Sequence, residues 1–308
     1  MSHWLETETR RMRPLLGTFV DVRARGLSKD AAARAIDEAF RQIAMVERRM
    51  SAHDARSDLG RLFHARGGTA LTVHPWTYEV IEASHRLHVL SGGIFDVTIG
   101  ANLERHSFLP AWGRKAGERI SGTMARIELL GDNRIRLRRP MRLDLGGIAK
   151  GFAVDRAIDA LMAAGASGGL VNAGGDFRIF DAAAEPLFVR DPAAPQRILR
   201  VGTIQIGAVA TSSGYFRRRW KDSQLLAPYI DGRTGKIVNL RNSITVIAAS
   251  CMWADALTKV LALDWQTGAA LLDRFDAKAL LLRENGRASD PIVFPPAQGC
   301  DLGIHTGT

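Results

Sequence analysis

The sequence predicts an α+β fold. Segments with helical spacing of apolar residues intermix with short segments rich in β-branched residues, and they do so without the regular β-α-β order of a doubly wound sheet. The length of 308 residues is enough to bury a large core, either as one body or as two closely packed lobes. We therefore expect a single domain over residues 1–308 that begins with a flexible N-terminus at residues 1–13.

Composition limits the function classes. With 46% hydrophobic and 24% charged residues, the chain is typical of globular proteins. Its net charge of +10 favours an anionic partner, but the basic residues are scattered and lack interleaved aromatic residues, which argues against nucleic acid as the main ligand. Two cysteines exclude a disulfide framework, and no Cys/His cluster has zinc spacing. No signal-peptide pattern and no run of about 18 apolar residues is present, so we expect a cytoplasmic protein that does not insert into membranes.

The first half of the chain alternates strands and helices. A strand is expected at 15–24, entered through Gly17, and Ser28 then caps a long helix. The remaining elements expected here are a short helix after Ser57, a helix that opens at 72–75 and stops at Gly92-Gly93, and a β-hairpin of 127–130 with 135–137.

The stretch 141–156 organises the middle of the chain. It reads as a short strand that ends at Asp144, a glycine-rich turn, and an amphipathic helix that stops near Gly165. Unpaired N–H groups at the helix start, together with Lys150, suit a phosphate, but such turns are equally common as plain connectors. The turn matches neither of the two best-known nucleotide-binding loops, so spacing alone leaves both interpretations open.

The second half is richer in strands. The expected elements are a buried strand at 169–179 broken by a Gly-Gly bend, strands at 201–210 and 243–249, a helix from Trp253, another at 267–275, and a late strand at 279–282.

Asp255, Thr258 and Lys259 share one face of the helix that starts near Trp253. Asp and Thr at this spacing offer two hard oxygen ligands that suit Mg²⁺, whereas Asp and Lys four residues apart are equally an ordinary ion pair. A Ser/His/Asp hydrolase is a weaker hypothesis, because the serines lack the sharp strand-to-helix turn of a catalytic serine.

Six segments, in this order, resemble the ApbE family of FAD:protein FMN transferases. They are Phe95–Gly100 (FDVTIG), Leu143–Asp155 (LDLGGIAKGFAVD), Val171–Asp176 (VNAGGD), Ala210–Tyr215 (ATSSGY), Ile230–Gly235 (IDGRTG) and Ala254–Leu257 (ADAL). The resemblance implies a T-fold-related α+β architecture of two lobes with a flavin cleft between them. It also implies that FMN is moved from FAD to a Thr or Ser hydroxyl of an acceptor flavoprotein, with release of AMP.

The resemblance further implies a set of site residues. Leu16, His53, Phe95 and Asp96 would line the flavin site, Asp144 and Lys150 would contact FAD, and Ile230 would also bind the cofactor. Gly147, Asp255 and Thr258 would hold Mg²⁺ on the FAD pyrophosphate. The catalytic set implied is Asp255, Thr258 and Lys259.

Two positions depart from the family's pattern. Lys259 stands where a threonine usually follows the metal aspartate, and its ammonium would weaken Mg²⁺ binding or neutralise a phosphate in place of the metal. Pro228 stands where a histidine could accept a proton, so either another base serves or transfer is slow. These departures favour an alternative, a flavin-binding or flavin-delivery protein without transferase activity. A third hypothesis is FAD pyrophosphate hydrolysis to FMN and AMP.

Overall fold

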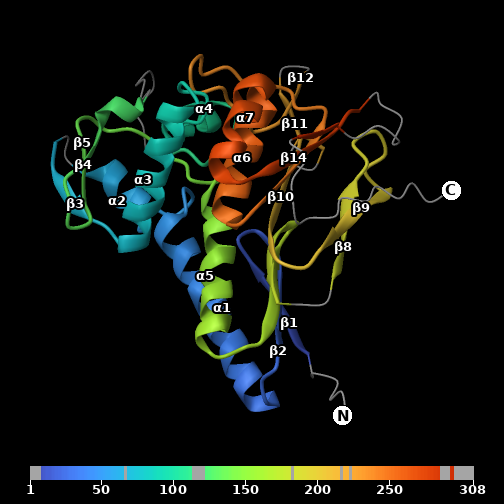
Figure 1. The fold of residues 1–308 in the computed structure, drawn as a ribbon. Helices are drawn as coiled ribbons and strands as arrows, with labels where there is room; N and C mark the ends of the chain where they lie inside the picture. Colours follow the sequence, from blue (N-terminus) through green and yellow to red (C-terminus); the bar gives the residue numbers. More distant parts are fainter. Residues whose placement is uncertain are drawn as a thin grey trace, which may run out of the picture.

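A computed structural model describes residues 8–65, 68–112, 122–181, 184–215, 218–221, 224–284 and 292–294. Its centre is an eight-stranded sheet in which all neighbouring strands are antiparallel (Figure 1). In spatial order the strands are β1 (Thr9–Leu15), β2 (Thr18–Arg25), β6 (Gly168–Ala173), β7 (Asp176–Phe180), β10 (Gly207–Ser213), β13 (Ser243–Ala248), β14 (Lys278–Leu282) and β15 (Ile292–Phe294).

Three helices cover one face of this sheet. They are α1 (Lys29–Met50), α5 (Ala149–Ala163) and α6 (Cys251–Leu263). Alternate residues of each strand point to this face, so that Ile244, Val246 and Ala248 of β13 join the main core while Ile247 joins a second core on the other face. A hairpin of β8 (Glu185–Arg190) and β9 (Ile198–Ile204) covers that second face.

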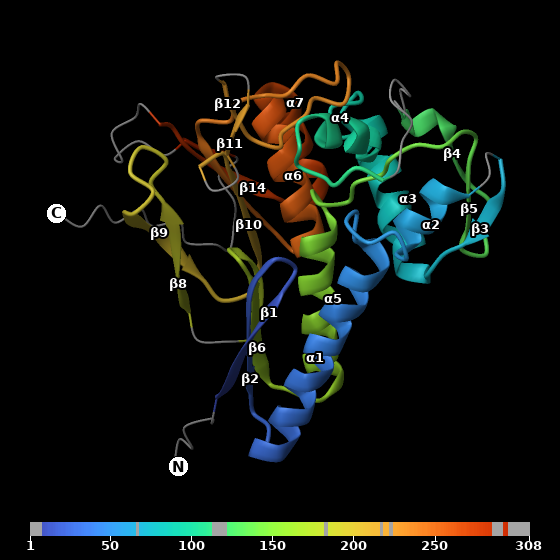
Figure 2. The ribbon, with the colours of Figure 1, turned by 180° about the vertical axis from the view of Figure 1, so that it is seen from behind.

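A smaller group of elements lies on the far side of the helices from the large sheet, as the two opposite views show (Figures 1 and 2). Its helices are α2 (Asp58–His64), α3 (Pro75–Leu90), η1 (Val97–Ile99), α4 (Gly100–Arg105) and η2 (Met124–Arg126). Its sheet consists of β3 (Ala70–Thr72), β5 (Arg134–Leu137) and β4 (Ile127–Leu129). The chain is completed by β11 (Arg219–Lys221), β12 (Gln224–Leu226), α7 (Trp265–Leu271) and η3 (Asp273–Phe275).

The predicted α+β class is confirmed, and several element boundaries are corrected. Thr9–Leu15 form β1, so the expectation of a flexible N-terminus fails for that part of 1–13, and residues 1–7 lie outside the described chain. The chain enters β2 through a two-residue hairpin turn at Leu16 and Gly17, whose φ angles of 56° and 70° make the tight reversal. The Gly-Gly bend expected within 169–179 separates β6 from β7, whereas the single strand expected at 201–210 is two strands, β9 and β10. The short strand expected to end at Asp144 does not form, because residues 141–145 are extended without strand pairing. Within the described residues, no helix is both long and apolar enough to cross a membrane.

The N-termini of α5 and α6 are joined by exchanged hydrogen bonds. Asp155, on α5, accepts from the N–H groups of Cys251 (3.0 Å) and Met252 (2.9 Å) at the start of α6. Asp255, on α6, accepts in turn from the N–H of Gly151 (3.1 Å) at the start of α5. Each carboxylate therefore satisfies backbone donors that the partner helix cannot pair internally, and each lies where the helix dipole favours negative charge.

Gly151 makes this junction possible. A Cβ atom at this position would lie 2.1 Å from the carbonyl oxygen of Cys251, which is far inside van der Waals contact. The close approach of the two backbones therefore depends on the missing side chain.

We predict that Asp155→Ala lowers the free energy of unfolding by about 3 kcal/mol, because it leaves buried N–H groups of α6 without an acceptor. The matched control is Asp159→Ala, one turn further along α5, where the carboxylate is 44% exposed and the change should cost less than about 1 kcal/mol. Urea unfolding of both variants measures the difference. Equal losses of unfolding free energy in the two variants would show that the hydrogen bonds of Asp155 to α6 add no stability beyond that of an exposed carboxylate.

Candidate functional site

Several predicted site residues meet where α5 begins, against the middle of α6. The Gly147 backbone packs on Lys259 and Phe95, because a Cβ at Gly147 would lie 3.2 Å from Lys259 Cγ and 3.5 Å from Phe95 Cε2. The N–H of Asp144 donates to the Val97 carbonyl at 2.8 Å, which ties the extended segment before the turn to the Phe95 segment. The structure thus brings residues 95–97, 144–147 and 259 into one cluster, although they are far apart in sequence.

Two lysine–aspartate pairs form the charged part of this cluster. The Lys150 ammonium donates to the Asp176 carboxylate, and the Lys259 ammonium donates to Asp255 Oδ1 at 2.5 Å. Both carboxylates are buried, with side chains 2% and 0% exposed for Asp176 and Asp255. The two ammonium groups neutralise the two carboxylates, and buried ionised groups require such pairing.

Hydroxyl groups complete the surroundings of Lys259. Its ammonium donates to Ser212 Oγ at 2.9 Å and to Thr258 Oγ1 at 3.0 Å, and it lies 3.2 Å from the main-chain oxygen of Asp255. Ser212 Oγ and Thr258 Oγ1 are 2.7 Å apart, and Thr258 Oγ1 also donates to the Asp255 carbonyl at 2.6 Å. An ammonium therefore sits at the centre of four oxygen atoms.

The charges in the cluster shift one another's pKa values. Burial opposes the charge on Lys150, but Asp176 and Asp255 outweigh burial and raise the pKa of Lys150. Burial raises the pKa of Asp176, although Lys150 pulls it down. For Asp255, burial is likewise opposed by Lys259 and Lys150, whose attraction, together with hydrogen bonds, leaves the pKa of Asp255 below its ordinary value.

The loop that carries Ile230 lies against the Phe95–Asp96 segment. The N–H of Gly232 donates to the Ile94 carbonyl at 3.1 Å, and a Cβ at Gly232 would lie 2.5 Å from the Cβ of Asp96. Asp96 itself caps η1, because its Oδ1 accepts from the Thr98 N–H at 2.6 Å. A side chain at 232 would therefore push this loop away, which explains why a glycine stands here.

Leu16 and His53 lie in two turns, one between β1 and β2 and the other after α1. Leu16 lies in the β1–β2 turn, where its N–H donates to Glu47 Oε1 at 3.1 Å. That turn lies at the same sheet end as Asp176, because Val20 pairs with Ala173 and Ala173 pairs with Asp176. His53 is exposed in the turn after α1, and its described contact is local, from its N–H to Ser51 Oγ at 3.1 Å.

A buried arginine anchors the loop beside His53. Arg142 donates to the carbonyl of Ala52 at 2.8 Å and to that of Pro110 at 3.2 Å, and its guanidinium lies 3.2 Å from the centre of the Trp112 ring. Arg142 precedes Asp144 by two residues, so it links the His53 loop to the segment that enters the glycine-rich turn. Arg142 was not among the predicted site residues.

The predicted Mg²⁺ ligands do not fit a metal in the arrangement described. Oδ1 and the main-chain oxygen of Asp255, and Oγ1 of Thr258, already contact the Lys259 ammonium, and the stem of Lys259 packs on Gly147. The second carboxylate oxygen of Asp255 accepts from Gly151. Across the described parts of the chain, no three His, Cys, Asp or Glu side chains gather as a metal site.

Two of the backbone N–H groups that were expected to suit a phosphate at the glycine-rich turn already have partners within the protein. At the start of α5, the N–H of Ala149 donates to the Leu145 carbonyl at 2.8 Å and that of Gly151 donates to Asp255. These two N–H groups are therefore engaged within the protein. The Lys150 side chain, 24% exposed, is the group at this turn that best suits a phosphate.

Asp176 and Ser212 were not among the predicted site residues, yet both lie inside segments that carry the family resemblance. Asp176 follows the tight β6–β7 turn and holds Lys150, while its Oδ1 accepts from the Thr211 N–H at 3.2 Å. Ser212, on β10, faces α6 and contacts Lys259. Their positions inside these motifs are the sequence signal that could have identified them as site residues.

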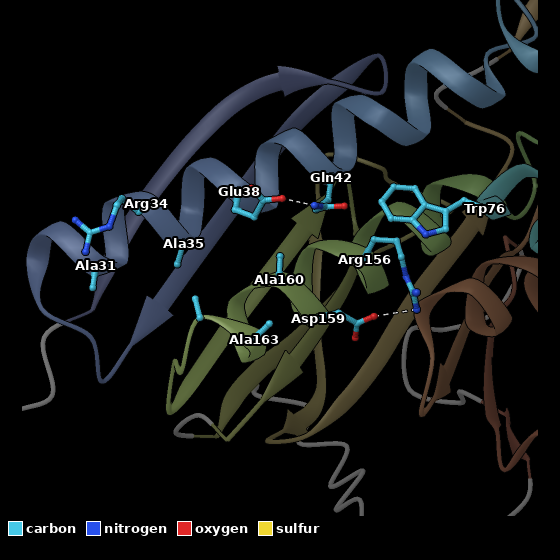
Figure 3. Close-up of a pocket in the computed structure, with 11 residues that line it drawn as sticks. Ala31, Arg34, Ala35, Glu38, Gln42, Trp76, Arg156, Asp159, Ala160 and Ala163 are labelled. Atoms are coloured by element: carbon cyan, nitrogen blue, oxygen red, sulfur yellow. Dashed lines mark hydrogen bonds and ion pairs between the residues drawn. The ribbon is translucent and has the colours of Figure 1, made fainter. Parts of the chain in front are cut away.

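A groove of about 600 Å³ lies elsewhere, between α1 and α5 (Figure 3). Trp76 stands at one end of the groove, and the ion pair of Arg156 with Asp159 lies along its α5 side (Figure 3). Its lining contains no residue predicted for FAD, the metal or catalysis. The groove therefore adds nothing to the candidate site, and the flavin cleft expected between two lobes stays a prediction.

We predict that Lys150→Met lowers the free energy of unfolding by about 2–3 kcal/mol at pH 7, because it leaves the buried Asp176 charge less compensated. Without Lys150, the pKa of Asp176 rises further above its unfolded value of about 3.9, so the folded chain holds this proton more tightly than the unfolded chain. The deficit relative to wild type should then grow as pH rises above about 4.

Urea unfolding of Lys150→Met at several pH values measures this dependence. The double variant Lys150→Met/Asp176→Asn should recover more than half of the loss. A deficit that is the same at pH 5 and at pH 8, or a double variant no better than the single one, would contradict the pairing.

Comparison with known proteins places the chain in a family. The ApbE family matches residues 16–281. Two relatives named FAD:protein FMN transferase are those of Vibrio cholerae (27% identical over 261 residues, 80% of this chain and 78% of the relative) and Treponema pallidum (28% identical over 320 residues, 93% of this chain and 88% of the relative).

The solved ApbE protein of Thermotoga maritima is 26% identical, with a TM-score of 0.77 over 91% of this chain and 96% of its own. The flavin transferase ApbE of Vibrio cholerae, at 24% identity, shares the fold with a TM-score of 0.77 over 94% and 97%. The chain belongs to the ApbE family.

Proposed function

We propose that this chain is an FAD:protein FMN transferase, which attaches FMN from FAD to a Thr or Ser hydroxyl of an acceptor flavoprotein. One observation carries the proposal: several of the residues that the family resemblance assigned to FAD and catalysis lie together where α5 begins, against the middle of α6. They are Phe95, Asp96, Asp144, Gly147, Lys150, Asp255, Thr258 and Lys259. The names of the relatives support the same activity.

The reaction exchanges one phosphorus–oxygen bond for another. The acceptor hydroxyl oxygen bonds to the phosphorus of the FMN half, the bridging bond of the pyrophosphate breaks, and AMP leaves with its electron pair. The hydroxyl proton passes to solvent or to a base other than Pro228, which has no group to accept it. Catalysis of such a step consists mainly of positioning and of stabilising negative charge.

Each predicted residue has a role in this proposal. Phe95, Asp96, Leu16 and His53 line the flavin side, and Ile230 supports it from its loop. Asp144 orients the adenosine end or its ribose, and Lys150 contacts phosphate. The domain spans both lobes, acts in the cytoplasm, and needs neither nucleic acid nor a membrane.

The positive charge for the pyrophosphate has two candidate sources. Mg²⁺ held by Gly147, Asp255 and Thr258 stays a prediction. The described arrangement favours lysine, because Lys259 already fills the place between Asp255 and Thr258. No reaction step in the proposal depends on the metal.

The test is incubation of the purified chain with FAD and an acceptor domain that a known ApbE transferase modifies. We expect covalent FMN on the acceptor by mass spectrometry, with AMP released in equal amount. An unlabelled acceptor, with FAD bound to the chain and no AMP released, would instead support a flavin-holding protein. The contact of Lys259 with Asp255, the predicted metal ligand, favours this alternative. AMP and free FMN without label would indicate FAD hydrolysis.

For Asp144→Ala we predict that the KM for FAD rises about tenfold while kcat changes less than about threefold, because a lost hydrogen bond to a charged group costs about 1.5 kcal/mol in uniform binding. Glu82→Ala, which removes an exposed carboxylate from α3, is the control and should leave both constants unchanged. A fall in kcat with unchanged KM would assign Asp144 to the chemical step instead.

A further inference from the structure

The Lys259 ammonium lies in surroundings that resemble those of a bound metal ion. It contacts a carboxylate oxygen, a main-chain carbonyl oxygen and two hydroxyl oxygens, from Asp255, Thr258 and Ser212. Hard oxygen atoms of these kinds are the ligands of Mg²⁺ and Ca²⁺ in proteins. An ordinary surface pair of Asp and Lys on one helix face has no such shell.

The hydroxyl protons are directed away from the ammonium. The Thr258 hydroxyl donates to the Asp255 carbonyl, so the Ser212 hydroxyl is the donor in the contact between Ser212 and Thr258. Both oxygen atoms therefore turn lone pairs toward Lys259. Such an orientation is the one that a cation requires.

The shell also uses every donor of the ammonium. A lysine has three N–H groups, and the three shortest contacts, to Asp255 Oδ1, Ser212 Oγ and Thr258 Oγ1, are 2.5, 2.9 and 3.0 Å. The buried Asp255 is compensated by these contacts, and its side chain is 0% exposed while that of Lys259 is 22% exposed. The charge of Asp255 is thus neutralised from within the chain.

We propose that Lys259 is the resident cation of this site, an internal replacement for a divalent metal, so that the chain folds and binds FAD without Mg²⁺. The part that concerns FAD rests on the proposed function, whereas the part that concerns the cation does not. Two ammonium groups, Lys150 and Lys259, then face two carboxylates before FAD arrives, and Lys150 is left to approach the pyrophosphate.

The experiment compares two replacements of Lys259 in the full-length, chelator-treated protein. Lys259→Thr removes the ammonium and frees the oxygen shell, whereas Lys259→Met removes the charge but fills the same space. Lys29→Thr, at an exposed position at the start of α1, controls for the loss of one lysine. The first readout is the melting temperature with and without about 5 mM Mg²⁺, in the absence of FAD.

We expect Mg²⁺ to leave the melting temperature of wild type and of Lys29→Thr unchanged. Both Lys259 variants should melt about 5 °C or more below wild type in chelator, because Asp255 is buried without its partner. Mg²⁺ should raise the melting temperature of Lys259→Thr by about 3 °C and leave that of Lys259→Met unchanged. Stabilisation of wild type by Mg²⁺, or no recovery of Lys259→Thr, would overturn the proposal.

The second readout is FAD affinity, measured by flavin fluorescence. Mg²⁺ should change the Kd of wild type less than about twofold and tighten that of Lys259→Thr about tenfold, a difference of about 1.4 kcal/mol. A tenfold gain for wild type would show that the metal, and not Lys259, serves the site. If neither wild type nor any variant binds FAD, the proposed function fails. The melting data still decide whether Lys259 is the resident cation.

Discussion

The exchange of carboxylates between α5 and α6 is the interaction on which the site depends. Asp155 caps the start of α6 and Asp255 accepts from the start of α5, so each helix fixes the other's N-terminus. This junction sets the position of Lys150 on one helix and of Lys259 on the other. The geometry at Asp255 therefore follows from helix capping before any ligand is considered, because one of its two oxygen atoms is committed to Gly151.

The same junction explains why charged groups are tolerated in a buried place. An isolated buried carboxylate costs several kcal/mol, but Asp176 and Asp255 each have an ammonium and a backbone N–H. The network is complete only if the strands β7 and β10 present Asp176 and Ser212 toward α5 and α6. Sheet and helices are thus held in register by polar contacts as well as by the core.

Sequence reasoning predicted the elements whose signals are local. The helix after 148, the 127–137 hairpin and the helical face of residues 255, 258 and 259 follow from periodicity, turn residues and spacing. It placed the break between β6 and β7 at the Gly-Gly bend but did not separate β9 from β10, because a two-residue turn inside an apolar run leaves the pattern nearly unbroken. Contacts between the sheet and its covering helices, such as Asp176 with Lys150 and Ser212 with Lys259, carry no local signal at all.

The departure at Lys259 illustrates how one residue can alter a site while the fold is kept. A threonine at this position would leave Asp255 facing an empty oxygen shell that needs a divalent ion, and the ion would bring two charges. A lysine fills the shell with one charge and satisfies every oxygen from within the chain. The fold then no longer depends on the metal, but the pyrophosphate loses a ligand that could bind it directly, since the three N–H groups of Lys259 are already used. Lys150 consequently carries the direct phosphate contact, so the strength of FAD binding should follow Lys150 more closely than it follows the metal concentration.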